Sequence, residues 1–389
     1  MRRRVLYIPG YDPIPPRRYR ELFKREGAEQ ANISGYELET GARTDRTGFG
    51  WGASTVIEGR KSEAEFEVLI WSDIVSGSMG QSIPATYTQL FRTAWVYIGS
   101  GALWRLMKLR RAPVIAALYP IVVLLAQALV AIMAGWFTGW LVALIATWWV
   151  GLPAAIIIFG FGLHLWRRID GKLFAYYLMH DYAFTAQNGG AYPPALDERI
   201  SHFAERITQV ANNDWDEVLI VGHSSGAYIA VSVLARLARE GHLPDKVALL
   251  TLGHVVPMAS FLPKADALRQ DLHDLAASPL PWIDVTAPGD ACCFGLCDPV
   301  AVSNTAPESG GGPLILSAAF TRTLSSRKQA ELRRRWFRLH FQYLCAFDLP
   351  KDYDYFQITA GPQTLAARYD GRHHSPGRIS RPVNRWSYP

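Results

Sequence analysis

A serine flanked by glycines is the strongest chemical signal in the chain. Residues 217–230 read EVLIVGHSSGAYIA and contain the pattern Gly-x-Ser-x-Gly with Ser224 at its centre. A serine can act as a nucleophile when a sharp, strained turn between a strand and a helix exposes its hydroxyl group. Such a turn needs small neighbours, which Gly222, Ser225 and Gly226 supply. The alternative is a plain serine turn, because so short a pattern also arises by accident.

The segments around Ser224 predict the turn that such a nucleophile needs. Residues 217–222 have the unbroken apolar centre that is typical of a parallel strand covered on both faces. Residues 226–240 then have the apolar spacing of a helix, whose first N–H groups can face an oxyanion formed on the serine. This context favours the nucleophile over the plain turn.

The same alternation of strands and helices continues on both sides of this motif. It predicts an α/β fold with a mostly parallel sheet and helices on both faces. We expect strands at residues 3–11, 35–40, 54–59, 65–75, 246–253, 282–290 and 313–320, and helices at residues 17–30, 85–109, 172–184, 195–213 and 266–277.

Residues 3–20 and 195–345 resemble the α/β-hydrolase superfamily, in its lipase and esterase branches. The resemblance rests on the GHSSG motif, on an early strand that ends IPGY, and on the order of the candidate triad residues. It implies an α/β-hydrolase-like fold. It also implies an oxyanion hole made by the N–H groups of Ser225 and Tyr11.

The resemblance further implies that the acid and the histidine follow the serine in the chain. Asp290 comes after a strand and a Pro-Gly turn, where the family places its acid. The alternative for Asp290 is a turn-forming aspartate. Asp284, within the strand, and Asp298, farther on, are weaker candidates for the acid.

His340 is the predicted base. It lies in the apolar and aromatic segment RRRWFRLHFQYL, which can bury an imidazole beside a carboxylate. His373 and His374 also follow Asp290, but they lie in a polar tail that we expect to be mobile. Three other histidines are weaker, because two precede the acid and one is expected to pack inside the motif: His254, His273 and His223.

A long uncharged segment predicts a membrane hairpin. From Ala112 to Trp166 the chain contains no Asp, Glu, Lys or Arg, whereas one bilayer crossing needs about 20 apolar residues. We expect two transmembrane helices, at residues 113–134 and 140–163, with a turn at residues 135–139 that contains two glycines. The alternative is a helical hairpin buried in a soluble fold, which would need burial on all sides.

The flanks of this segment predict its orientation. Basic residues precede and follow the pair of helices, so both ends are expected in the cytoplasm. A hairpin that leaves and returns on one side can interrupt a domain without splitting it. We therefore expect residues 1–92 and 173–350 to form one hydrolase domain, residues 93–172 an insertion, and residues 351–389 a partly disordered tail.

The amino-acid composition limits the classes of partner that this chain is expected to bind. Hydrophobic residues make up 49% of the chain and charged residues only 19%, which excludes disorder and favours a membrane link. The net charge of +6 and the 13 Trp suit an anionic lipid surface, and no motif predicts a nucleic-acid partner. We expect reduced thiols and no metal site or cofactor from the four cysteines, Cys292, Cys293, Cys297 and Cys345.

Together these patterns predict a membrane-anchored serine hydrolase that faces the cytoplasm. Ser224 would attack an acyl ester, His340 would transfer the proton and Asp290 would orient the histidine. A lipid or long-chain acyl ester is expected because the anchor keeps the site near the bilayer. The alternative is a non-catalytic hydrolase-like domain that serves as a membrane scaffold or partner-binding module. The oligomeric state does not follow from the sequence.

Overall fold

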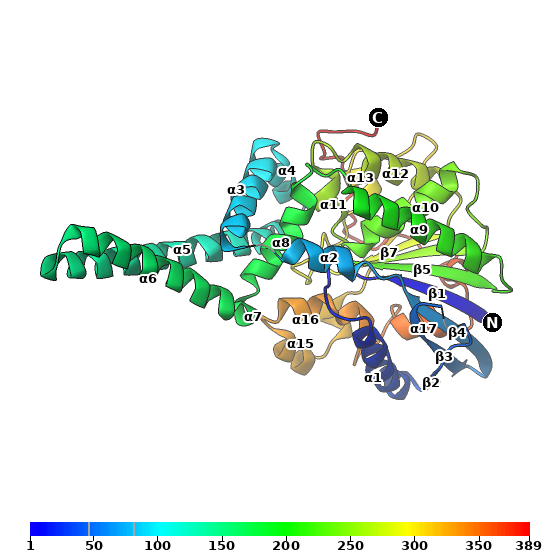
Figure 1. The fold of residues 1–389 in the computed structure, drawn as a ribbon. Coiled ribbons are helices and arrows are strands. Elements are labelled where there is room, and N and C mark those ends of the chain that lie inside the picture. Colours follow the sequence, from blue (N-terminus) through cyan, green and yellow to red (C-terminus); the bar gives the residue numbers. More distant parts are fainter. Residues whose placement is uncertain (46, 81) are drawn as a thin grey trace.

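The computed structural model describes residues 1–389 apart from residues 46 and 81, and its centre is an eight-stranded sheet (Figure 1). The strands lie in the order β2-β3-β4-β1-β5-β6-β7-β8. Neighbours from β4 to β8 are parallel, whereas the β2–β3 and β3–β4 pairs are antiparallel. The strands are β1 (Arg2–Ile8), β2 (Glu37–Gly41), β3 (Phe49–Ile57), β4 (Arg60–Val68), β5 (Glu217–His223), β6 (Val247–Leu252), β7 (Trp282–Thr286) and β8 (Leu314–Ser317).

Helices cover both faces of the sheet because the central strands are apolar on both sides. Along β1, Leu6 and Ile8 pack on one face with α9, α10 and α12, while Val5 and Tyr7 pack on the other with α1 and α17. The predicted α/β class with a mostly parallel sheet is confirmed. The helices outside the long apolar hairpin described below are α1 (Arg17–Ser34), α2 (Ser72–Met79), α3 (Ile83–Gly99), α4 (Ala102–Leu109), α7 (Asp170–Leu173), α8 (Ala175–Ala186), α9 (Pro194–Ala211), α10 (Gly226–Arg239), α11 (Val256–Ser260), α12 (Asp266–Ala277), α13 (Pro299–Val302), α14 (Phe320–Thr323), α15 (Ser326–Leu332), α16 (Trp336–His340), the 3₁₀ helix η1 (Gln342–Leu344), α17 (Tyr355–Ala360) and α18 (Leu365–Arg368).

Two expected elements before the apolar hairpin end differently in the structure. The strand expected at 65–75 stops at Val68, and α2 begins at Ser72. The helix expected at 85–109 is divided into α3 and α4 because Gly101 adopts a left-handed conformation, with φ of 73°. A left-handed residue interrupts the helical path of the backbone.

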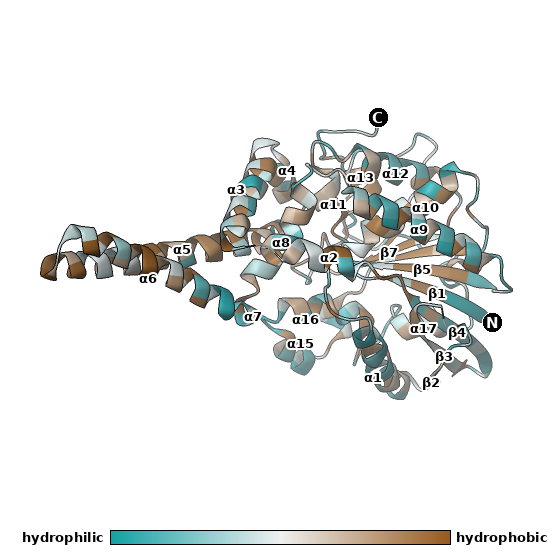
Figure 2. Cartoon of the chain, viewed as in Figure 1, coloured by the Kyte–Doolittle hydropathy of each residue, from teal (hydrophilic) through white to brown (hydrophobic). Residues whose placement is uncertain are grey.

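Two long apolar helices project from the globular body as a hairpin (Figure 1). They are α5 (Arg111–Ile145) and α6 (Trp148–Arg168), and both are long and apolar enough to cross a membrane. Figure 2 shows hydrophobic residues along most of the pair. In the most apolar 18-residue stretch of each helix, only 22% (α5) and 11% (α6) of the stretch is buried. The hairpin is therefore not the buried core of a soluble fold.

The predicted turn of the hairpin is wrong. We expected it at residues 135–139, but α5 continues to Ile145 and the chain turns at Ala146 and Thr147. The glycines of the expected turn instead allow α5 and α6 to approach closely. A Cβ atom on Gly135 would lie 2.6 Å from the carbonyl oxygen of Ala155. A Cβ atom on Gly139 would lie 2.8 Å from the carbonyl oxygen of Gly151.

Both ends of the hairpin lie at the globular body (Figure 1). At its base the hydroxyl group of Tyr119 on α5 donates to the carbonyl oxygen of Leu173, at 2.8 Å. The indole ring of Trp336 on α16 packs edge-on against the ring of Tyr119. The hairpin therefore leaves and returns beside the helix that ends at His340.

The tail, which was expected to be partly disordered, packs against the body. It contains α17 and α18, and its last part is held by hydrogen bonds. The N–H of Ile379 donates to the carbonyl of Leu296 at 2.8 Å, and the side chain of Asn384 donates to the carbonyl of Ser260 at 2.9 Å. Backbone pairing of this kind cannot be inferred from a sequence rich in Pro, Gly and Arg.

Candidate active site

Ser224 lies at the turn between β5 and α10, in the left-handed region, with φ of 58°. This conformation is disfavoured for a residue with a Cβ atom and persists only where the surroundings impose it. The N–H of Ser224 donates to the carbonyl of Leu252 at 2.9 Å, and its carbonyl accepts from the N–H of Ala227 at 3.1 Å. The predicted strand-to-helix turn is therefore present, with its strain at the serine.

The glycines around Ser224 are required by close backbone contacts. A Cβ atom on Gly226 would lie 2.1 Å from the carbonyl oxygen of Ile8. A Cβ atom on Gly10, in the loop after β1, would lie 2.9 Å from the Cβ of Ser224. Because β1 and β5 are adjacent and parallel, the loop after β1 reaches the serine turn. The loop after β1 and the serine turn can therefore approach this closely only because Gly10 and Gly226 have no side chain.

His340 and Asp290 form a buried hydrogen-bonded pair. His340 is the last residue of α16, and Asp290 follows β7 through a short turn. Nδ1 of His340 donates to Oδ2 of Asp290 at 2.7 Å, and both side chains are nearly excluded from solvent. Burial alone would raise the pKa of Asp290, but the charge of His340 and the hydrogen bonds to the carboxylate hold this pKa below its usual value.

Further hydrogen bonds fix the carboxylate of Asp290. The hydroxyl group of Tyr343 donates to Oδ2 at 3.1 Å and accepts from the N–H of Ala287 at 2.9 Å. The N–H of Cys292 donates to Oδ1 at 2.9 Å. Both carboxylate oxygens therefore have donors, which holds Asp290 ionised and in place beside the histidine.

His223 packs against His340 and forms a hydrogen bond with its backbone. Its Nε2 donates to the backbone carbonyl of His340 at 3.0 Å, and its ring lies 4.9 Å from the His340 ring, centroid to centroid. Burial, with a further contribution from the charge of His340, lowers the pKa of His223 to about 3. A neutral, buried ring agrees with the packing role expected from the sequence.

One cavity of about 470 Å³ joins the predicted site residues. It lies at the carboxyl ends of β1 and β5, where open α/β sheets usually bind their ligands. Ser224, Ser225, His340 and Tyr11 all line it. We call it the Ser224 cavity; its other lining residues are Gly10, Asp12, Pro13, Ile14, Arg18, Pro113, Phe174, Tyr177, Leu178, Asp181, Tyr182, Thr185, His223, Val255, Met258, Cys292, Phe337 and Phe341.

The backbone N–H groups of Tyr11 and Ser225 are free for a ligand. Within the described chain, neither of them donates to a protein acceptor. The carbonyl of Tyr11 is held by the hydroxyl group of Tyr177, at 2.5 Å, and its side chain by a hydrogen bond to Ser78. Two unpaired donors beside a serine can stabilise the negative charge of a tetrahedral intermediate.

The weaker candidates lie elsewhere. Asp284 accepts from Thr251 at 2.6 Å and lies 3.7 Å from His254, in a pair that is fully buried and lines no described cavity. Asp298 caps α13. The other histidines are engaged away from Ser224: His273 stacks on Tyr388, His374 accepts from the N–H of Ile315 beside β8, and His373 is exposed.

Asp290, Cys292 and His340 are close enough to share a metal ion, with ligand atoms within 4.8 Å of one another. Their chemistry favours a hydrogen-bonded pair instead. A metal would need the thiolate of Cys292, but burial and the nearby charge of Asp290 raise the pKa of this thiol well above its usual value. The direct bond to Asp290 already uses Nδ1 of His340.

Two residues of the site were missed in the sequence. Tyr343 follows His340 by three residues, and only the fold shows that its hydroxyl group reaches Asp290. Asp181 comes from α8, beyond the apolar hairpin, and lines the Ser224 cavity. The one available signal was an isolated acidic residue within the apolar segment FAYYLMHDYAF.

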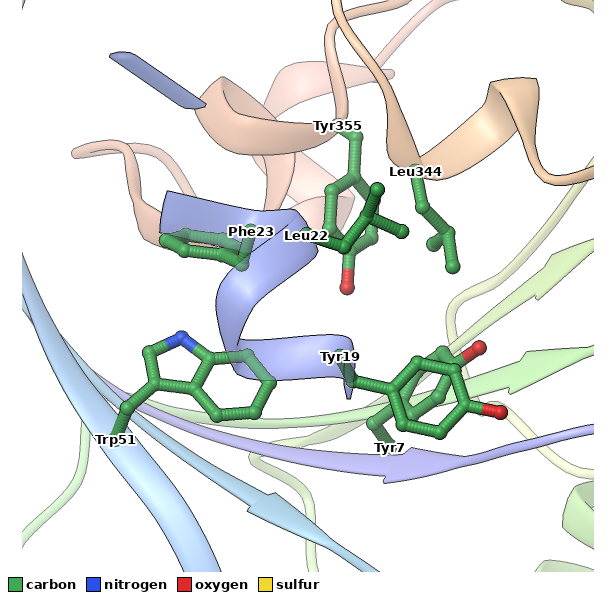
Figure 3. A pocket seen from close by; sticks show the side chains of 7 residues that line it. All are labelled: Tyr7, Tyr19, Leu22, Phe23, Trp51, Leu344 and Tyr355. Atoms are coloured by element: carbon green, nitrogen blue, oxygen red, sulfur yellow. The ribbon is translucent and has the colours of Figure 1, made fainter. Parts of the chain in front are cut away.

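A second, much smaller cavity lies on the other face of the sheet, among aromatic side chains (Figure 3). Its volume is about 10 Å³, which at most admits a single water molecule. The buried hydroxyl group of Tyr7 has no hydrogen-bond partner in the described chain. This gap belongs to the packing of α1 against the sheet and is separate from Ser224.

Comparison with protein-family models, curated proteins and solved structures gives no match for this chain. The resemblance to α/β-hydrolases therefore remains a prediction, and the function has to be inferred from the geometry of the site.

Proposed function

We propose that this chain is a membrane-anchored serine hydrolase with an α/β-hydrolase-like domain, and that it cleaves acyl esters of the lipid or long-chain class. One observation carries the proposal. Ser224, strained at a strand-to-helix turn, lines the same cavity as His340, which is hydrogen-bonded to the buried carboxylate of Asp290. Three such groups are what nucleophilic catalysis by a serine requires.

In the proposed reaction, Oγ of Ser224 bonds to the ester carbonyl carbon while its proton passes to Nε2 of His340. The oxyanion accepts hydrogen bonds from the N–H groups of Tyr11 and Ser225. The bond to the alcohol then breaks, and the alcohol takes the proton from His340. A water molecule, deprotonated by the same histidine, releases the acid and restores Ser224. Asp290 holds the histidine with Nε2 toward the serine and stabilises its positive charge.

The location of the site supports an apolar substrate. Pro113, near the start of α5, lines the Ser224 cavity together with the aromatic side chains of Phe174 and Phe337. The cavity therefore adjoins the base of the apolar hairpin, where an acyl chain leaving the bilayer would arrive. The basic residues at the two ends of the hairpin favour a cytoplasmic domain under the positive-inside rule: Arg105, Lys108, Arg110, Arg111, Arg167, Arg168 and Lys172.

A fluorophosphonate probe tests the proposal, because its phosphorus traps an activated serine as the fluoride leaves. The purified, detergent-solubilised protein should be labelled, peptide mass spectrometry should locate the adduct on Ser224, and Ser224→Ala should abolish it. Heat-unfolded protein is the control and should not react, because an isolated serine is a weak nucleophile. Folded protein that resists the probe would favour the non-catalytic scaffold.

A further inference from the structure

Asp181 is an acidic residue that the proposed mechanism does not use. It lies on α8 and lines the Ser224 cavity with Ser224 and His340. Its neighbours Tyr177, Tyr182 and Leu178 on the same helix also line this cavity. A carboxyl group in such an aromatic and apolar wall is costly to desolvate unless it has a partner.

The other charged side chains of the cavity have partners. Asp12 accepts from the hydroxyl group of Tyr19 at 2.7 Å and pairs with Arg18 at 3.3 Å, while His340 pairs with Asp290, which lies behind the cavity wall. Asp181 has neither a hydrogen bond from its side chain nor a cation within 4 Å in the part of the chain that the structure describes. It is the cavity's unpaired carboxyl group.

Burial raises the pKa of Asp181 to about 7, against the opposing effect of the charge of His340. The carboxyl group can therefore act as an acceptor or as an anion near neutral pH. In either state its carboxyl oxygens can accept a hydrogen bond from a donor that a ligand brings into the cavity.

We propose that Asp181 selects the substrate: it binds a hydroxyl or ammonium group close to the scissile ester and disfavours esters that carry a carboxylate or phosphate there. This inference rests on the proposed hydrolase function and adds the polar chemistry of its substrate. The apolar wall accounts for the acyl chain, and the unpaired carboxyl group accounts for the polar part. Arg18 does not attract an anion instead, because Asp12 already neutralises it.

Four esters that share a hexanoyl chain test this inference, with choline, glycerol, ethanol or glycolic acid as the alcohol. At pH 8 the wild-type protein should have a higher kcat/KM for the choline and glycerol esters than for the ethyl ester, and the lowest for the glycolate ester. Asp181→Asn should lower kcat/KM for the choline ester about 10- to 100-fold, because the variant loses the attraction between the carboxylate and the quaternary ammonium, which donates no hydrogen bond. The same variant should leave the ethyl ester within about threefold and improve the glycolate ester.

Asp197→Asn is the matched control, because Asp197 lies on α9, away from the cavity, and pairs with Arg236. It should leave all four rates unchanged. An unchanged choline-to-ethyl ratio in Asp181→Asn, or an equal loss on all four esters, would overturn the role of Asp181 while leaving the hydrolase proposal intact. A wild-type protein that cleaves no ester and resists the fluorophosphonate would remove both.

Discussion

Nδ1 of His340 donates a hydrogen bond to Oδ2 of Asp290 at 2.7 Å, although 50 residues separate them in the chain. The contact joins the end of α16 to the turn after β7. It leaves Nε2 of His340 available at the cavity that Ser224 also lines. A base oriented by a buried carboxylate is the feature that separates a nucleophilic site from a serine that only forms a turn.

The contact between Gly10 and Ser224 leads to a prediction about the serine turn. In Gly10→Ala the new methyl group would lie 2.9 Å from the Cβ of Ser224, so one of the two backbones must move. Displacement of a reacting group by about 1 Å can reduce a rate about 100-fold, and we expect a loss of that order in kcat. Gly41→Ala is the control, because its Cβ would meet no atom within 4 Å. Equal rates for the two variants would show that the turn tolerates the displacement.

The sequence predicts a site residue well when the segments that position it are close to it in the chain, and poorly when they are far away in the chain. Ser224 and its glycines could be identified because a strand, a tight turn and a helix follow one another within a few residues. The contact of His340 with Asp290 depends on the packing of α16. The order of residues along the chain therefore identified both as candidates but could not predict that they touch. Asp181 reaches the cavity because α8, which follows the hairpin, packs against the body, and no local sequence pattern predicts that packing.

The hairpin, too, could be predicted only in part from the sequence. Its existence follows from composition, because the uncharged run is far longer than one crossing needs. Its turn does not, because a glycine serves equally well in a turn and in a close helix contact. Gly135 and Gly139 face Ala155 and Gly151 on α6, a pairing that exists only in three dimensions.

The raised pKa of Asp181 predicts how stability depends on pH. Folded Asp181 retains its proton up to about pH 7, whereas the unfolded residue releases it near its ordinary pKa of 3.8. Between these values the unfolded state binds fewer protons, so this residue lowers stability as the pH rises. Asp181→Asn removes the effect, and its Tm relative to wild type should be higher at pH 8 than at pH 5.

The groups that face Asp181 are His340, the thiol of Cys292 and several tyrosines. The charge of His340 opposes the rise in the pKa of Asp181, and its ring is hydrogen-bonded to Asp290. Burial raises the pKa of the thiol of Cys292 and of the surrounding tyrosines, so they stay neutral: Tyr11, Tyr97, Tyr177, Tyr182 and Tyr228. A Tm difference that stays constant from pH 5 to pH 8 would contradict the raised pKa of Asp181.

A small apolar cavity behind the Ser224 cavity predicts the response to acyl length. It has a volume of about 30 Å³, lies among α3, α4, α5 and α8, and shares Tyr182 and Met258 with the Ser224 cavity. Met258→Ala should connect the two spaces and move the preferred acyl chain of an ester series to greater length. Met133→Ala, on the exposed part of α5, is the control. A preference that is unchanged in Met258→Ala would place the acyl chain elsewhere.

The hairpin predicts opposite locations for its tip and its base. Thr147, at the turn, and Lys172, after α6, are both exposed. In intact cells a membrane-impermeant maleimide should label Thr147→Cys, whereas Lys172→Cys should react only after permeabilisation. The wild-type chain, with its own cysteines, gives the background. Labelling of both positions from the same side would mean that the hairpin does not cross the bilayer.

The most direct test of the proposed site is the hydrolysis rate of the single and double variants of Ser224 and His340. Ser224→Ala and His340→Ala should each lower kcat by about three orders of magnitude or more, and the double variant should lose little beyond either, because the two residues act as one unit. His373→Ala combined with His374→Ala should keep nearly the full rate. Substantial hydrolysis by Ser224→Ala, or losses that multiply in the double variant, would contradict a shared mechanism for Ser224 and His340.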